Sequence, residues 1–275
     1  MHASPKIAFI GAGNMGGSII RGLISAKTVT PCDITICCKS NLRHSAFREM
    51  GVNIALSVSE AIRDASYIFL CVKPKDIASV VSDISSSANL KENAILVSIA
   101  ASVSTSMICD FGNKAFPVIR TMPGMPLLIG EGTVAISRNH LVADRSYQYI
   151  CRLFSSIALI SVMEEEQMNA IISVNGSSPA YVFYMIKSMV EGAQEQGIDP
   201  DRALPLILQT IIGTAKMLEN TDLSIDDQIA RICSSRGTTI AAMDVLRSSD
   251  FSETLKRAMN ACTQRADEIS KELST

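Results

Sequence analysis

The first part of the chain alternates short apolar runs with helical patterns. The runs that predict strands lie at residues 6–10, 33–38, 52–55, 67–72, 94–99, 117–120, 133–137 and 159–162, and helical patterns lie near 59–63, 76–84 and 104–111. The run 67–72 is continuously apolar, which is typical of a strand in a parallel sheet covered on both faces. This alternation predicts an α/β fold with a doubly wound sheet and a ligand bound beyond the carboxyl ends of the strands.

The pattern changes near Met163, beyond which we expect only helices. Helical patterns cover residues 164–196, with an interruption around 175–179, and then 201–220, 224–233, 238–246 and 253–273. The sequence therefore predicts two domains, an N-terminal sheet domain of residues 1–162 and a C-terminal all-helical domain of residues 163–275.

The helical pattern at 201–220 is apolar on almost every side. Such a helix has to be buried all round, and a helical domain of this size has little interior to bury it. We therefore expect a homodimer in which a second copy covers this helix, which makes the C-terminal part a dimerisation domain. A monomer with an unusually central helix is the alternative.

A glycine motif lies between the first predicted strand and an apolar helix pattern. It reads Gly11, Ala12, Gly13, Asn14, Met15 and Gly16. The first glycine allows a tight turn, the second lets the backbone approach a pyrophosphate, and the third lets helix pack on strand. The helix N-terminus adds free N–H groups and a partial positive charge. The motif predicts a dinucleotide site, and a plain glycine turn is the alternative.

The end of the second predicted strand indicates which dinucleotide is preferred. An NAD site has Asp or Glu about 20 residues after the glycines, where it holds the ribose 2′-hydroxyl. Here the region reads Cys38, Lys39, Ser40 and Asn41, with Arg43 close by. A cation and small polar side chains suit a 2′-phosphate, and no carboxylate repels it. We expect NADPH as the preferred cofactor and NADH as a second one. The alternative is that these residues form a solvated basic loop without a role in binding.

Composition excludes several classes of protein. With 25 basic and 27 acidic residues the net charge is −2, which argues against a nucleic-acid or membrane-surface binder. No apolar run approaches the roughly 18 residues of a membrane helix. Only five residues precede the first strand, so we expect no secretory signal. The eight cysteines form no C-x-x-C pair and no zinc pattern. We therefore expect no metal, and reduced thiols in a cytoplasmic protein.

A second loop of small residues opens an apolar helix late in the chain. It reads Ser234, Ser235, Arg236, Gly237, Thr238 and Thr239. Backbone N–H groups at the start of this helix are suited to hold a carboxylate, and the threonines are equally suited to cap the helix. Spacing alone does not separate these two interpretations.

Six motifs in a fixed order make the chain resemble the pyrroline-5-carboxylate reductases over essentially its full length. They lie at residues 9–15, 72–74, 120–123, 176–181, 215–218 and 237–240. The resemblance implies a Rossmann domain, then a helical domain that interlocks into a dimer, and decamers in several members. The implied reaction is hydride transfer from NAD(P)H to the C=N carbon of a cyclic imine carboxylate. Its product would be L-proline, which makes it the last step of proline biosynthesis.

The resemblance also implies roles for particular residues. It places the substrate carboxylate on backbone N–H groups near Gly237 and Thr238, in the loop that begins at Ser234, and it gives Thr239 a hydrogen bond to the ring nitrogen. Glu165 matches a family glutamate near the active site. The residues expected along the nicotinamide and ribose are Val72, Lys73, Pro74, Ala100 and Ala101. Catalysis would then consist mainly of positioning the imine carbon against the nicotinamide.

Two departures from the family pattern keep other functions open. Arg236 stands where the family usually has glycine, and Gly124 stands where it usually has asparagine. One alternative is a related NADPH-dependent imine or keto-acid reductase with an altered pocket, and another is a non-catalytic paralogue that binds the nucleotide. The β-hydroxyacid dehydrogenases need a catalytic lysine on the first long helix after the Rossmann domain. Lys187 is the nearest candidate but lacks their Gly and Asn pattern, so we discount this class.

Overall fold

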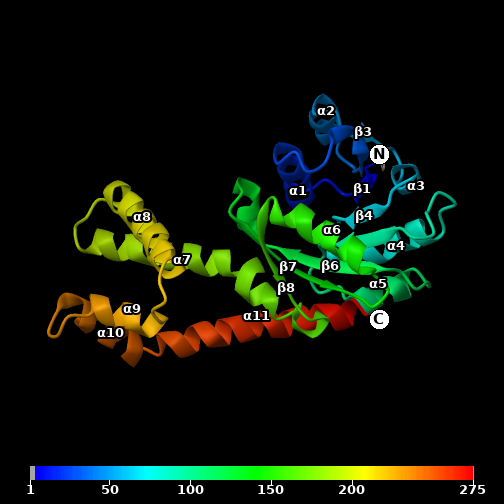
Figure 1. Cartoon of the computed structure of the whole chain (residues 1–275). Coiled ribbons are helices and arrows are strands. Elements are labelled where there is room, and N and C mark those ends of the chain that lie inside the picture. The colour runs from blue at the N-terminus through cyan, green and yellow to red at the C-terminus, as the bar shows by residue number, and fades with distance from the viewer. Residues whose placement is uncertain (1–3, 275) are drawn as a thin grey trace. The chain divides into compact units, whose positions relative to one another are not determined.

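The computed structural model describes residues 4–274, which form two compact units (Figure 1). The first unit comprises the chain up to Ser177 together with the segment from Ala261 onward, and the second is Ser178–Asn260. The last helix, α11 (Phe251–Ser274), therefore begins in the second unit and ends in the first. The predicted domain boundary after residue 162 concerns which parts of the chain fold independently, and it stays a prediction.

The first unit is built on one sheet, whose described strands have the order β3-β2-β1-β4-β5-β6-β7-β8. Their bounds are β1 Ile7–Ile10, β2 Ile34–Cys37, β3 Asn53–Ile54, β4 Tyr67–Leu70, β5 Ile95–Ser98, β6 Val118–Pro123, β7 Gly132–Arg138 and β8 Ala158–Val162. The order of the first six is that of doubly wound dinucleotide-binding folds. Neighbouring strands are parallel except β6 and β7, which a short connection joins as an antiparallel pair. The expected α/β fold is confirmed.

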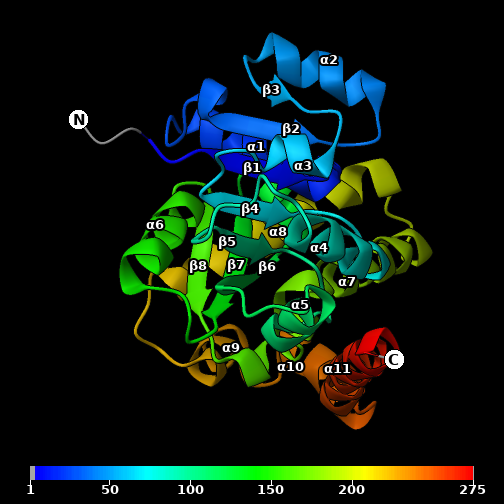
Figure 2. The same cartoon turned by 90° about the vertical axis from the view of Figure 1, so that its right-hand side faces the viewer.

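Helices cover both faces of this sheet. They are α1 Asn14–Ser25, α2 Asn41–Glu49, α3 Val58–Ala61, α4 Ile77–Ser85, α5 Thr105–Phe111 and α6 Asp144–Ser155. Side chains alternate along β1, so that Ile7 and Phe9 join one core with α1 and α6, whereas Ala8 and Ile10 join another with α3, α4 and α5. Figure 2 shows α6 on the opposite side of the sheet from α4 and α5.

Helix α2 has no counterpart among the helices expected from the sequence, and neither has α6. In α6 the buried residues Tyr147, Ile150, Cys151 and Phe154 repeat every three or four positions, which is the pattern of an amphipathic helix. Cys37, Cys38 and Cys71 fall in or beside apolar strand runs, where burial is expected, but they are half-buried. Cys38 and Cys71 lie just beyond the ends of their strands, β2 and β4.

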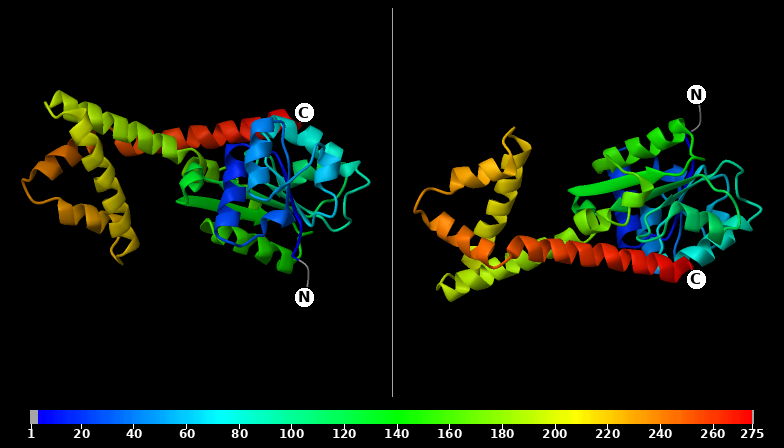
Figure 3. Two further views of the ribbon diagram at one scale, coloured as in Figure 1. Left: turned by 90° about the horizontal axis from the view of Figure 1, so that it is seen from above. Right: turned by 90° about the horizontal axis from the view of Figure 1, so that it is seen from below.

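The second unit is helical and contains α7 Ser178–Glu195, α8 Pro200–Glu219, α9 Ile225–Ile232, α10 Thr238–Ser248 and the start of α11 (Figure 3). The interruption expected near residues 175–179 is present as a π-helical turn, Ile172–Gly176, directly before α7. Within residues 4–274 no helix has the length and hydropathy to cross a membrane.

Helix α8 is not buried all round within this chain. Among its described residues only Ala203 is buried, and Leu206 is 69% exposed. Its other exposed apolar residues are Leu204, Leu208, Ile212, Met217 and Leu218. The expectation of complete burial is therefore not met by contacts within the chain, and α8 keeps a large apolar surface.

Candidate active site

The sheet register aligns the ends of four parallel strands. Cys37, Ile10, Leu70 and Ser98 are direct neighbours across β2, β1, β4 and β5, and adjacent strands lie about 4.8 Å apart. The loops that leave this edge, with the first turns of the helices that follow them, hold the residues expected to bind the dinucleotide: Gly11, Ala12, Gly13, Asn14, Met15, Gly16, Lys39, Ser40, Val72, Lys73, Pro74, Ala100 and Ala101. This edge is also where ligands bind in doubly wound folds.

The glycine turn has the geometry that a phosphate cradle needs. Gly11 has a φ of +93°, and a Cβ there would come within 2.6 Å of the Cys71 carbonyl oxygen. A Cβ on Gly16 would come within 2.8 Å of Cys71 Cβ, so this glycine lets α1 approach β4. Gly13 precedes α1 as its N-cap, and a Cβ there would meet no described atom within 4 Å. The backbone at Gly13 is therefore open to a ligand.

Arg43 contacts the glycine turn from α2. Its guanidinium donates to the Ala12 carbonyl, and to Asn14 Oδ1 at 3.1 Å. This contact holds a cation against the turn on which the pyrophosphate would bind. The sequence indicated only that Arg43 is near, because the contact joins residues 31 positions apart.

The loop after β2 leaves its polar groups available. Lys39 is exposed, and Ser40 precedes α2 as its N-cap without a capping hydrogen bond from its side chain. On the far side of β1, the loop after β4 runs into a 3₁₀ turn, Pro74–Asp76, whose N-cap is Lys73. Lys39 and Lys73 are exposed at this edge, whereas the Val72 side chain packs against the core.

The loop after β5 is held tightly by its neighbours. Ala100 N donates to Ser98 Oγ at 3.2 Å, and Thr121 Oγ1 donates to Ser98 O at 3.0 Å. Ala100 is buried, whereas Ala101 is half-buried. Of these two residues, Ala101 is the one with more surface to offer a nicotinamide.

Glu165 is part of a partly buried hydrogen-bond network. Its Oε1 accepts from Arg120 Nη1 at 3.2 Å and from the Thr105 backbone N–H at 3.0 Å, and its Oε2 accepts from Ser137 Oγ at 2.6 Å. Arg120 is only 4% exposed. Burial lowers the pKa of this guanidinium, while the Glu165 carboxylate opposes that change. The geometry gives Glu165 a structural role between β6, β7 and α5, and its expected contact with substrate stays a prediction.

The loop from Ser234 to Thr239 forms a tight turn at the start of α10. Gly237 is the N-cap and, as a glycine, has no side chain with which to cap the helix. A Cβ on Gly237 would come within 2.3 Å of Ser234 Oγ and 3.0 Å of the Ser234 carbonyl oxygen, so a side chain here would displace the Ser234 hydroxyl. With Gly237 at the N-cap, Thr238 and Thr239 lie inside the helix rather than at the capping position, so the capping interpretation loses support. The Gly237 N–H donates to the Ser234 carbonyl oxygen at 3.0 Å, whereas the N–H groups of the first helical turn have no intrahelical acceptor and are suited to an anion.

The backbone suits the residue present at only one of the two departures from the family pattern, Gly124. Arg236 has a φ of +59°, a left-handed conformation that glycine adopts without strain. At the other departure, a Cβ on Gly124 would come within 2.8 Å of the Asn175 carbonyl oxygen in the π-helical turn. An asparagine at position 124 would therefore require this turn to shift.

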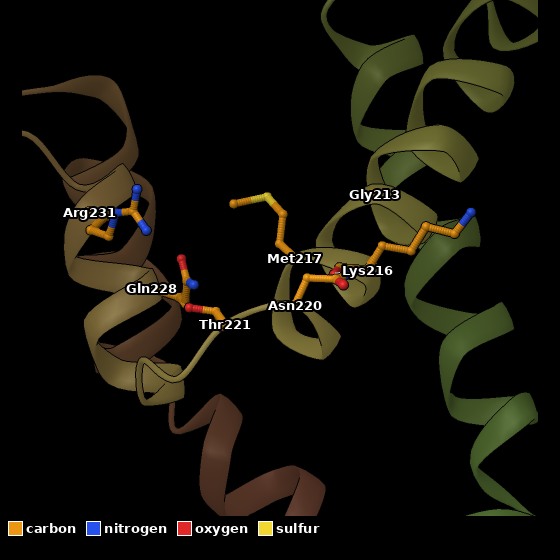
Figure 4. Close-up of a pocket in the computed structure, with 7 residues that line it drawn as sticks. All are labelled: Gly213, Lys216, Met217, Asn220, Thr221, Gln228 and Arg231. Atoms are coloured by element: carbon orange, nitrogen blue, oxygen red, sulfur yellow. The ribbon is translucent and has the colours of Figure 1, made fainter.

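A pocket of about 370 Å³ lies between α8 and α9. It is lined by Gly213, Lys216, Met217, Asn220, Thr221, Gln228 and Arg231 (Figure 4). Met217 extends from α8 toward Gln228 and Arg231 on α9, whereas Lys216 points away from them. The lining contains none of the residues expected to bind substrate, so the pocket is not evidence for that site.

Comparisons with known proteins now identify the chain's relatives. Residues 165–269 match a family described as pyrroline-5-carboxylate reductase dimerisation. Residues 6–102 match a family described as NADP oxidoreductase, coenzyme F420-dependent. The first region covers the helices of the C-terminal part, and the second runs from β1, which precedes the glycine turn, to the loop after β5.

Individual relatives agree over nearly the whole length. The pyrroline-5-carboxylate reductase of Escherichia coli K12 is 33% identical over 97% of this chain and 98% of its own. A solved structure of such a reductase from Coxiella burnetii is 28% identical, with a TM-score of 0.88 over 96% of this chain and 98% of that one. The Plasmodium falciparum enzyme, solved with NADP bound, is 24% identical, with a TM-score of 0.87 over 97% and 98%. The chain therefore belongs to the pyrroline-5-carboxylate reductase family.

Proposed function

We propose that the protein reduces 1-pyrroline-5-carboxylate to L-proline with NAD(P)H, the last step of proline biosynthesis. The observation that carries this proposal is the alignment of four strand ends beside a glycine turn, in a chain that belongs to this family. The pyrophosphate would bind the N–H groups at the start of α1. Bound NADPH would supply the hydride for the imine carbon.

The residues of the chain supply binding and orientation. Gly13 leaves the turn open, and Arg43 adds a cation to it. At the start of α10, backbone groups near Gly237 and Thr238 would hold the substrate carboxylate, chiefly the Thr238 N–H, because the Gly237 N–H already donates to the Ser234 carbonyl oxygen. The Thr239 hydroxyl would hydrogen-bond the ring nitrogen as it gains a proton. Holding the reacting atoms in this way lowers the entropy cost of reaching the transition state.

We propose that the protein works as a homodimer. The apolar surface of α8 supports this, because a second copy would remove it from water, and the helical region matches a dimerisation family. Assembly of dimers into a decamer is the next step that the resemblance implies, and light scattering distinguishes these masses. The described cysteines are free thiols, which suits a location in the cytoplasm.

The deciding experiment follows the loss of NADPH absorbance when purified protein meets 1-pyrroline-5-carboxylate, with NADH in parallel and proline measured as product. We expect turnover with both cofactors and faster turnover with NADPH. Tight NADPH binding without turnover would contradict the proposal. A panel of other cyclic imines would then test the altered reductase, and inactivity on all of them would indicate the non-catalytic paralogue, for which Arg236 is the motivating residue.

We expect Lys39→Glu to shift cofactor preference toward NADH. A carboxylate at this exposed position would repel the 2′-phosphate of NADPH. Like charges in contact cost enough free energy to change the ratio of kcat/KM for NADPH to kcat/KM for NADH by about tenfold or more. Lys91→Glu is the matched control, because Lys91 is also exposed but precedes β5 and so lies at the opposite edge of the sheet. An unchanged NADPH to NADH ratio in Lys39→Glu would refute this role for the loop.

A further inference from the structure

The loop between β5 and α5, residues 99–104, has a conformation that depends on a distant part of the chain. Ser102 is buried and has a φ of +63°, a left-handed backbone that is strained for serine. Its carbonyl oxygen accepts a hydrogen bond of 2.6 Å from Ser270 Oγ on α11. The strained residue is thus held from outside its own loop.

The Ser270 hydroxyl is oriented by the groups around it. Its single proton has two carbonyl acceptors in reach, Ser102 O at 2.6 Å and Ala266 O at 3.1 Å, and the shorter contact is the one to the loop. Its oxygen accepts from Asn169 Nδ2 at 3.1 Å. Asn169 therefore donates to Ser270, which leaves the hydroxyl proton for Ser102.

Asn169 has only one orientation that suits its partners. Its Oδ1 accepts from Arg120 Nη2 at 2.6 Å, and its Nδ2 also donates to Asp267 Oδ1 at 2.8 Å. Arginine can only donate and a carboxylate only accepts, so the two ends of the amide are not interchangeable. The chain of bonds from Arg120 to Ser102 thus has a fixed direction.

The same network reaches the other end of the loop. Glu165, which pairs with Arg120, accepts from the backbone N–H of Thr105 in the first turn of α5. Leu273 on α11 packs against the core cluster that contains Ala100 and Val103. Figure 1 shows the C-terminal end of α11 beside α5. The loop is consequently fixed on both sides, by side chains that do not belong to it.

We propose that Ser270 is a positioning residue for hydride transfer, which acts with Asn169 to fix loop 99–104 in the conformation that receives the nicotinamide. The end of α11 then controls how the reactive ring lies against the sheet edge. This inference rests on the proposed function, because that function places the nicotinamide on Ala100 and Ala101.

The test compares Ser270→Ala with Ser274→Ala. Ser274 lies on the same helix and is exposed, and its hydroxyl donates to the Ser270 carbonyl at 2.8 Å rather than to the loop. In Ser270→Ala we expect amide hydrogen exchange across residues 102–105 to become about tenfold faster. We also expect kcat to fall about tenfold. The primary isotope effect on kcat, with NADPH deuterated at the transferred position, should rise. Ser270→Thr, which keeps the hydroxyl, should restore all three.

Each outcome decides for or against the inference. If Ser270→Ala matches Ser274→Ala in exchange and in isotope effect, the inference is wrong. If exchange becomes faster but kcat and the isotope effect stay unchanged, the Ser270 hydrogen bond holds the loop without positioning the nicotinamide ring, which also overturns the inference. Should Ser270→Ala fail to fold, Ser270→Cys, whose thiol is a weaker donor, is compared with Ser270→Thr. Equal exchange rates at residues 102–105 in these two variants would contradict the role of the Ser270 hydrogen bond. Absence of turnover in the unmodified protein would refute the proposed function instead. The exchange rates at residues 102–105 would still show whether Ser270 holds the loop.

Discussion

Replacing Thr239 with alanine is expected to lower kcat for reduction of 1-pyrroline-5-carboxylate by about 100-fold, the loss typical of removing one group that stabilises developing charge. The affinity for NADPH should stay the same, since this residue lies in the loop proposed for substrate. The expected effect depends on the hydroxyl alone, because the threonine does not cap α10 in the structure. Steady-state kinetics, together with NADPH binding by fluorescence, measure the two quantities separately.

Thr238→Ala is the matched control for this experiment. Thr238 precedes Thr239 in the first turn of α10, but the proposal assigns it a backbone N–H rather than its hydroxyl. We expect near-normal kcat in Thr238→Ala. A wild-type rate in Thr239→Ala would remove that hydroxyl from the mechanism, and equal losses in both variants would point to a disturbed helix turn.

The second large effect concerns stability. Arg120→Met is expected to lower the free energy of unfolding by about 2 kcal/mol, because removing one partner of a partly buried ion pair leaves the other uncompensated. The decrease falls below that of a fully buried pair because the Glu165 side chain is 25% exposed. Here the loss would leave Glu165 without its cation and Asn169 Oδ1 without its donor. Urea denaturation at fixed protein concentration, followed by circular dichroism, measures the difference.

Arg265→Met provides the comparison. It is the same substitution at an exposed arginine, whose side chain is 56% exposed and pairs with Glu268 and Glu272 on one helix. Exposed pairs contribute less than about 1 kcal/mol. Similar midpoints for the two variants would mean that the Arg120 network adds little to stability.

The sequence was sufficient for elements whose signal is local. The apolar strand before Gly11 and the glycine spacing predicted the turn, and the structure places that turn at the expected edge. Most helices of the second unit were predicted within a few residues, because their apolar periodicity is long and uninterrupted. Helix α2 was missed, and so was α6, although the buried positions of α6 repeat regularly. Helix α6 lies between two strands that were each recognised by their own apolar runs.

The parts of the site that the sequence did not predict depend on contacts between distant residues. Arg120 stood out only as part of a motif, although a charge within an apolar strand is a signal of a buried partner. Its partners Glu165 and Asn169 lie 45 and 49 positions away. Nothing in local spacing distinguishes Asn169 from a surface amide, or Ser270 from the other serines of α11. Such roles become visible only when the chain is folded.

The bond between Ser270 and Ser102 has a consequence for the order of folding. It joins residues 168 positions apart, and closing a long loop costs entropy that must be offset before the contact contributes. The strands around the glycine turn pair over much shorter separations, so the sheet can assemble while the loop after β5 is still open. A late intermediate of this kind would retain the phosphate cradle but lack a settled nicotinamide platform, so the ability to hold the cofactor would arise before the ability to use it.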